Sequence, residues 1–296
     1  MPFTFVKMHG LGNDYVYADG FSQSFADPAK LAIEVSHRNL GIGGDGLILA
    51  LPPEAGVDAD ARMRMFNADG SEGEMCGNGV RCVCKLVVDH QLGAGHTNNP
   101  LRIQTGRGVL KLKYEIGADG KVAQVRVDMS PPILDPAKVP ALTAKMRPTG
   151  QAQTFVVEAP GNGRAYEATL VSMGNPHAVI YVPEVSEKTR VQLLEDGKAL
   201  EFHPAFPRRI NVHFVQVLAR DEVRVLHWER GSGPTLACGT GTCAVAVAGM
   251  LTGRTGPAVT AHLPGGDLRI EWSGNPADSV FMTGPATEAF TGVWPA

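Results

Sequence analysis

Short stretches of alternating hydrophobic and polar residues dominate the chain. Alternation with a period of two is typical of half-buried strands, and each stretch ends at Gly, Pro, Asn or Asp. The clearest stretches span residues 101–105, 108–114, 121–129, 177–182 and 222–228. The pattern predicts a strand-rich fold.

Helical patterns are fewer. Residues 28–37 follow an aspartate and open with Pro28, which suits a first helical position, and residues 187–199 carry mixed charge around spaced apolar positions. Two further helices are predicted at 76–90 and 238–251, where a Gly-rich turn leads from a cysteine into an apolar run. The chain is therefore predicted to have an α+β fold.

Composition narrows the function classes. The 296 residues suggest two domains, and 44% hydrophobic with 19% charged residues is typical of a globular protein. A net charge of −3 without a dense basic stretch argues against nucleic acid and anionic membranes as partners. No apolar run reaches the roughly 20 residues of a membrane helix, and the first residues hold no apolar signal core. We therefore expect a cytoplasmic protein.

The five cysteines do not form a recognisable disulfide or zinc pattern. Their number is odd, no export signal precedes them, and no CxxC pair is present. Cys82, Cys84 and Cys243 lie within the predicted helical runs and are interpreted as core residues. We expect no bound metal.

An internal repeat singles out the other two cysteines. Three anchors recur in order at one constant separation of 162 residues, without net insertion. The matched segments are Gly12-Asn13 with Gly174-Asn175, Phe66-Asn67 with Trp228-Glu229, and Cys76-Gly77-x-Gly79 with Cys238-Gly239-x-Gly241. The simplest explanation is a duplicated domain, joined in the proline-rich stretch 129–140.

Each half thus offers one thiol at a Gly-rich turn that enters a helix. Backbone amides at a helix N-terminus bind anions, and the same location is expected to lower the pKa of a thiol. If the halves face each other, Cys76 and Cys238 reach one cleft from opposite sides. One thiolate can then remove a proton from a carbon while the opposite thiol delivers another, which inverts that carbon.

Several other readings remain open from the residues alone. Buried cysteine is common as a small core residue, and a cysteine with His177 could form a hydrolase pair. Residues 41–46 match GxGxxG, but a strand-like segment follows where a nucleotide site needs a helix. Glu229 and Arg230 are either an exposed ion pair or ligands for a substrate ammonium and carboxylate. A non-catalytic thiol or metal-binding protein is the alternative from another class.

The motifs also form a recognisable ordered series, from residue 7 to about 285. They are Lys7-Met8-His9-Gly10-Leu11-Gly12-Asn13-Asp14, Phe66-Asn67-Ala68-Asp69-Gly70-Ser71, Met75-Cys76-Gly77-Asn78-Gly79-Val80-Arg81, Gly174-Asn175-Pro176-His177, and Glu229-Arg230-Gly231-Ser232-Gly233 through Ala237-Cys238-Gly239-Thr240-Gly241. This series resembles the diaminopimelate epimerase family. Racemases acting on proline or hydroxyproline share the two thiols without the whole series.

The resemblance implies a cofactor-independent enzyme that interconverts LL- and meso-diaminopimelate in lysine and peptidoglycan precursor biosynthesis. It also implies two similar, pseudo-twofold-related domains, each a barrel-like, mostly antiparallel sheet around a central helix. The first expected domain is 1–130 with a C-terminal strand at about 284–296, and the second is 131–283. The active site is expected between the two domains, and the resemblance implies a homodimer.

The resemblance assigns roles residue by residue. Cys76 and Cys238 become the acid/base pair, and His177 and Glu229 the residues that tune it. Gly46 stands where some family members have a Gln that contacts the distal end of the substrate. The implied substrate-binding residues are Asn13, Asn67, Gly77, Asn78, Asn175, Asn211, Glu229, Arg230, Gly239 and Thr240.

Overall fold

The computed structural model describes residues 2–161 and 163–295 and falls into two units. Unit 1 comprises Met1–Asp128 and Thr283–Ala296, and unit 2 comprises Met129–Met282. The chain therefore leaves the first unit after Asp128 and returns to it at Thr283 for its last strand.

Unit 1 is built on a mostly antiparallel sheet. Its strands are β1 (Phe3–Gly10), β2 (Asn13–Asp19), β3 (Gly46–Leu51), β4 (Ala61–Asn67), β5 (Glu72–Gly73), β6 (Leu101–Thr105), β7 (Gly108–Ile116), β8 (Val122–Asp128) and β19 (Thr287–Trp294). β19, β1 and β2 pair antiparallel in that order, β2 pairs parallel with β3, and β3 antiparallel with β4. β4 pairs parallel with β6, and β6, β7 and β8 continue antiparallel.

Unit 2 repeats this pairing scheme. Its strands are β9 (Arg147–Pro148), β10 (Thr154–Glu158), β11 (Ala165–Ser172), β12 (Pro176–Tyr181), β13 (Asn211–Ala219), β14 (Glu222–Glu229), β15 (Gly233–Thr235), β16 (Ala258–Leu263) and β17 (Gly266–Glu271), with β18 (Phe281–Gly284) where the chain leaves the unit. β10, β11 and β12 pair antiparallel, β12 pairs parallel with β13, β13 antiparallel with β14, β14 parallel with β16, and β16 antiparallel with β17. The repeated anchors of the sequence thus fall on a repeated strand order.

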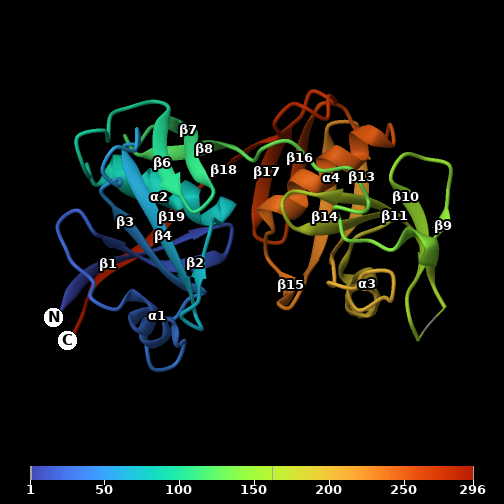
Figure 1. Ribbon diagram of the computed structural model, residues 1–296, viewed down its shortest axis with the longest axis horizontal. Coiled ribbons are helices and arrows are strands. Elements are labelled where there is room, and N and C mark those ends of the chain that lie inside the picture. Colours follow the sequence, from blue (N-terminus) through green and yellow to red (C-terminus); the bar gives the residue numbers. More distant parts are fainter. Residues whose placement is uncertain (1, 162, 296) are drawn as a thin grey trace. The chain divides into compact units, whose positions relative to one another are not determined.

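One helix lies among the strands of each unit (Figure 1). α2 (Gly77–Asp89) is buried without interruption from Gly77 to Val87, and α4 (Gly239–Leu251) is buried at all but three of its positions. A helix buried on every side must be enclosed, because an amphipathic surface helix exposes one face. α2 packs against strands β1–β4 and β6–β8, and α4 against β11–β13, β16 and β17. The predicted fold class is therefore confirmed.

The remaining helices cover the outside of the sheets. α1 (Pro28–Ser36) packs on β2, β3 and β4, and its N-cap Asp27 accepts a hydrogen bond from the Lys30 amide at 3.0 Å. α3 (Glu187–Glu201) packs on β13 and β14, and η1 (Thr143–Lys145) is a short 3₁₀ turn. All four predicted helices are confirmed, with ends that differ from the predicted ones by at most two residues.

The five predicted strands are also confirmed, as β6, β7, β8, β12 and β14. The GxGxxG segment at residues 41–46 runs directly into β3, which begins at Gly46. A dinucleotide site needs a helix at that point. Among the described helices, none is long and apolar enough to cross a membrane.

Candidate active site

Cys76 is the N-cap residue of α2. Its backbone is extended, with φ −130° and ψ 122°, and its Sγ accepts a hydrogen bond from the Gly79 amide at 3.4 Å. The thiol also donates to Asn13 Oδ1, 3.4 Å away. The first amides of a helix have no intrahelical acceptor, so those of Gly77 and Asn78 can bind an anion beside this thiol.

Asn13 is held in place by an acidic neighbour. It opens β2 directly after Gly12, whose φ of +87° is a left-handed conformation that favours glycine. Its Nδ2 donates to Asp45 Oδ2 at 2.8 Å, which turns Oδ1 toward Cys76. Sequence reasoning did not identify Asp45, because the contact bridges 32 residues.

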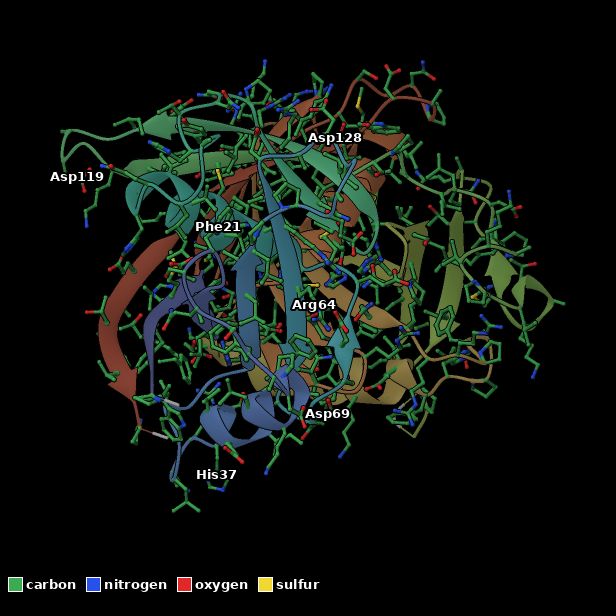
Figure 2. All side chains as sticks on the ribbon, turned by 60° about the vertical axis from the view of Figure 1, so that its left-hand side comes forward. Phe21, His37, Arg64, Asp69, Asp119 and Asp128 are labelled. Atoms are coloured by element: carbon green, nitrogen blue, oxygen red, sulfur yellow. The ribbon has the colours of Figure 1, made fainter. Side chains whose placement is uncertain are left out.

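Asn67 and Asn78 occupy different settings in unit 1. Asn67 ends β4, and its Nδ2 donates to Ser71 Oγ at 3.0 Å. Ser71 Oγ donates in turn to Asp69 Oδ1 at 2.6 Å, and Asp69 is labelled in Figure 2. Asn78 is buried, with 4% exposure, and its side-chain Oδ1 has no hydrogen-bond partner among the described residues.

Gly46 leaves no room for a longer side chain. A Cβ at this position would lie 2.0 Å from the Phe66 carbonyl oxygen and 2.7 Å from Cε1 of Tyr15. A carbonyl of a paired strand cannot move aside cheaply, since β3 and β4 pair at this point. A glutamine at residue 46 would therefore require the paired strands β3 and β4 to shift.

Cys238 is the N-cap of α4 and the counterpart of Cys76, but it is buried, with 3% exposure. Burial raises the pKa of its thiol well above the usual value, and the adjacent Glu229 carboxylate raises it further. The Gly241 amide and the Thr240 hydroxyl, whose Oγ1 lies 3.7 Å from Sγ, oppose this rise without cancelling it. The expected lowering of the pKa by the helix start is therefore wrong for Cys238, because desolvation and a neighbouring carboxylate outweigh the helix amides.

Glu229 is fixed by its own strand turn. It ends β14 opposite Gly233 of β15, and its Oε1 accepts a hydrogen bond from Thr235 Oγ1 at 2.6 Å. This bond holds the carboxylate beside the Cys238 thiol. Thr235 lies within the motif series, but the sequence alone predicted no function for it.

Asn211 and Glu201 brace the turn that carries Arg230. Asn211 Oδ1 accepts from the Arg230 amide at 2.9 Å, and its Nδ2 donates to the Pro176 carbonyl at 2.7 Å. Glu201 Oε1 accepts from the Gly231 amide at 3.0 Å. Arg230 is exposed, and its Nη1 donates to the Arg208 carbonyl at 3.1 Å. Sequence reasoning missed Glu201, which lies at the end of α3 and carries no local motif.

Asn175 and His177 lie together at the start of β12. Gly174 has a φ of +92°, the same left-handed conformation as its repeat partner Gly12. His177 Nε2 lies 2.9 Å from Asn175 Oδ1, and its Nδ1 lies 2.8 Å from His213 Nε2. Burial lowers the pKa of His177 to about 3, with smaller contributions from His227 and Arg230. His177 is therefore neutral at physiological pH.

Two clusters result, one in each unit. Cys76, Asn13 and the α2 amides meet in unit 1, whereas Cys238, Glu229 and the α4 amides of Gly239 and Thr240 meet in unit 2. Within residues 2–161 and 163–295, no three His, Cys, Asp or Glu side chains are grouped so as to hold a metal ion. Each cluster combines a thiol with helix-start amides that have no intrahelical acceptor, and such amides can stabilise negative charge beside an acid/base group.

Comparison with known proteins identifies the family. The family model described as diaminopimelate epimerase matches residues 5–134 and 169–288. The chain belongs to the diaminopimelate epimerase family. A diaminopimelate epimerase of Moorella thermoacetica is 49% identical over 295 residues, covering 98% of this chain and 99% of that protein. One of Methanococcus maripaludis is 46% identical over 289 residues, covering 97% and 98%.

This member of the diaminopimelate epimerase family also shares its fold with solved structures of lower sequence identity. A probable proline racemase from Agrobacterium radiobacter, with bound carbonate, has a TM-score of 0.66 at 17% identity, covering 98% of this chain and 92% of that one. A PhzF-family phenazine biosynthesis protein from Bacillus anthracis has a TM-score of 0.67 at 12% identity, covering all of both chains. The family resemblance inferred from the motifs is confirmed.

Proposed function

We propose that this protein is a diaminopimelate epimerase that interconverts LL- and meso-2,6-diaminopimelate, in the biosynthesis of lysine and of peptidoglycan precursors. The single observation that carries the proposal is the repeated thiol turn. In each of two units with one strand order, a cysteine is the N-cap residue of a largely buried helix, and the first amides of a helix have no intrahelical acceptor. The identity of the substrate, diaminopimelate, is inferred from membership of the family.

The reaction follows from two thiols in opposite protonation states. In one direction Cys76, as thiolate, accepts the α-proton from one face of the carbon, and the Cys238 thiol delivers its own proton to the other face. The bond from the carbon to the first proton breaks as its electron pair passes toward the carboxylate, and a new C–H bond forms on the opposite side. The raised pKa of Cys238 supports its role as the proton donor in this direction.

The backbone amides at both helix starts hold the reacting carboxylate in this account. Those of Gly77 and Asn78, with those of Gly239 and Thr240, stabilise the negative charge that develops on its oxygens as the proton leaves. Glu229 binds the substrate ammonium, and the Arg230 guanidinium binds a carboxylate. Asn13, Asn67, Asn175 and Asn211 supply further polar contacts, and His177 with Glu229 sets the environment of the thiols. No cofactor takes part.

A proline-type racemase is the nearest competing function, because structures of that kind share the fold. The experiment offers LL-diaminopimelate, L-proline and trans-4-hydroxy-L-proline separately to the reduced protein, without pyridoxal phosphate or added metal. We expect meso-diaminopimelate and no inversion of the two cyclic amino acids, as read by chiral chromatography. Inversion of proline or hydroxyproline without any meso product would overturn the assignment.

We also propose that the protein acts in the cytoplasm as a homodimer. All five cysteines are thiols, which suits a reducing compartment. The dimer is what the family resemblance implies, and sedimentation equilibrium of the reduced protein tests it: a single species of monomer mass would contradict it.

A further inference from the structure

Three fully buried histidines form a row in unit 2. His177 on β12, His213 on β13 and His227 on β14 each have 0% exposure. His213 and His227 are directly opposite each other in the antiparallel pair, and His177 is paired with Asn211, two residues before His213. Because alternate residues of a strand share one face, all three rings point to the same side of the sheet.

The rings are joined end to end by short nitrogen–nitrogen contacts. His177 Nδ1 lies 2.8 Å from His213 Nε2, and His213 Nδ1 lies 2.7 Å from His227 Nδ1. At the outer end, His177 Nε2 lies 2.9 Å from Asn175 Oδ1. Each contact needs one donor and one acceptor, since two N–H groups facing each other at this distance repel.

Burial keeps the three rings neutral, so each carries one N–H. It lowers the pKa of His177 and His227 to about 3 and that of His213 well below its usual value. A row of singly protonated rings has only two consistent arrangements, in which every donor points toward Asn175 or every donor points away from it. The choice is made at the far end of the row.

That far end is His227 Nε2, which is buried without a hydrogen-bond partner among the described residues. If the donors point away from Asn175, this nitrogen carries a buried, unpaired N–H group. If the donors point toward Asn175, His227 Nε2 keeps only an unpaired lone pair. Buried acceptors without a partner are more common in proteins than buried donors without one. The second arrangement places the protons on His227 Nδ1, His213 Nε2 and His177 Nε2.

We propose that His213 and His227 are positioning residues that fix the amide of Asn175, so that its Oδ1 is held by His177 and its Nδ2 is presented to a substrate carboxylate. The assignment of the carboxylate rests on the proposed function, whereas the direction of the histidine row does not. Among the described residues, no protein group accepts a hydrogen bond from Asn175 Nδ2. Asn175 thereby selects an oxygen acceptor and rejects an ammonium group at this point.

His213 also lies against the turn that carries the second thiol. A Cβ added at Gly241 would lie 2.4 Å from Cε1 and 2.7 Å from Nε2 of His213, and 3.1 Å from Cys238 Sγ. The imidazole therefore occupies space that only glycine leaves open. A test must separate this packing role from the hydrogen-bonding role.

The direction of the row is read directly by nuclear magnetic resonance. In the full-length protein with ¹⁵N-labelled histidine, long-range ¹H–¹⁵N correlation at neutral pH distinguishes the two neutral tautomers. We expect Nε2–H on His177 and His213 and Nδ1–H on His227. Nδ1–H on His177, or Nε2–H on His227, would overturn the proposal, and this result is independent of any activity.

Asn175→Asp tests which atom faces the substrate. The change is nearly isosteric and replaces the outward Nδ2 donor by an acceptor. We expect KM for diaminopimelate to rise by at least about 10-fold, since a favourable contact to the carboxylate becomes a repulsion. A KM that is unchanged or lower would mean that Oδ1 faces an ammonium, and would overturn the proposal.

A matched pair at His213 separates hydrogen bonding from packing. Gln offers an amide N–H near the place of His Nε2, whereas Leu has similar volume and no donor. We expect His213→Leu to raise KM several-fold and His213→Gln to restore it to within about twofold, with His262→Gln in the same unit as an unchanged control. A packing role predicts the reverse order, because a buried leucine is tolerated better than a buried glutamine. That reverse order would overturn the proposal, whereas a wild-type protein inactive on diaminopimelate would overturn the proposed function and leave the tautomer test standing.

Discussion

The two thiol turns share a backbone and differ in what surrounds them. Cys76 is half-buried, accepts a hydrogen bond from the Gly79 amide and donates one to Asn13. Cys238 is buried beside the carboxylate of Glu229. Beneath the first turn, Gly79 faces the apolar side chains of Ile48 and Met63. Beneath the second, the corresponding Gly241 faces an imidazole.

This difference shows how a repeated backbone arrangement can place two thiols in different chemical environments. The repeat fixes where each thiol stands, because N-cap geometry and Gly-rich entry are properties of the backbone. Neighbouring side chains then set the protonation of each thiol. Burial and Glu229 raise the pKa of the Cys238 thiol, which favours its protonated form.

The largest effect is expected from removing either thiol. Cys76→Ala and Cys238→Ala should each reduce epimerisation by roughly 10²–10⁴-fold, the contribution typical of a positioned general acid or base. Cys84→Ala is the matched control, since Cys84 is a fully buried residue of α2. Steady-state rates with thermal melts of the three variants check this. Equal loss in all three would indicate folding damage and remove the distinction between the thiols.

Glu229→Gln should remove the main electrostatic difference between the turns. The carboxylate raises the pKa of Cys238, so its loss lowers that pKa, and the thiol ionises at a lower pH than in the wild type. The alkaline limb of kcat/KM should therefore move to lower pH. The maximum should fall by roughly 10–100-fold, because a charged contact to the ammonium is lost. An alkaline limb that stays in place would contradict the role of Glu229.

Mild acid should destabilise unit 2 before unit 1. His177, His213 and His227 have depressed pKa values in the folded state. Below about pH 6.5 the unfolded chain therefore binds more protons than the folded protein, and the free energy of unfolding decreases as the pH is lowered. For His177 and His227 the loss is roughly 1 kcal/mol each for every pH unit, until their folded pKa values of about 3 are reached. The raised pKa of His262, held by Asp267 and Glu222, offsets part of it.

Hydrogen exchange with mass spectrometry at pH 7 and pH 5 resolves the two units. Peptides of β12, β13 and β14 should lose protection at pH 5, while those of β2, β3 and β4 change little. The depressed carboxyl pKa values of unit 1, such as that of Asp60, act only below about pH 4. Equal loss of protection in both units would show that the histidine row does not distinguish them.

The smallest expected contrast is between two glycine substitutions. At Gly79 an added Cβ would meet the flexible ends of Ile48 at 2.8 Å and Met63 at 3.2 Å, which can shift. At Gly241 it would meet a hydrogen-bonded ring at 2.4 Å. Gly241→Ala should therefore cost about 1–3 kcal/mol of unfolding free energy and Gly79→Ala less, as measured by urea denaturation. The opposite order would mean that His213 is free to move.

Local patterns predicted much of this fold. Alternation found β6, β7, β8, β12 and β14, and the cysteine-to-apolar runs found α2 and α4. These features are local because strand alternation and helix entry are set by neighbouring residues. The constant separation of the anchors also anticipated the repeated strand order, since strands in matched positions form matched pairs.

Contacts between distant segments were beyond sequence reasoning. Asp45 holds Asn13 from 32 residues away, and His213 meets His177 from 36 residues away. The burial of Cys238 depends on the packing of a whole unit, so the helix start alone led to the wrong direction for its pKa. A turn motif locates a thiol, but its protonation is decided by the tertiary environment.

In the proposed reaction one thiol removes the α-proton, and the other returns a proton from solvent to the opposite face. The most direct test incubates the reduced protein with LL-diaminopimelate in D₂O, without pyridoxal phosphate or added metal, and follows α-deuterium and meso product by mass spectrometry and chiral chromatography. We predict that each newly formed meso molecule carries one α-deuterium. Meso product that retains its original hydrogen at the inverted carbon in the first turnover, or no exchange in folded protein with both thiols reduced, would contradict this mechanism.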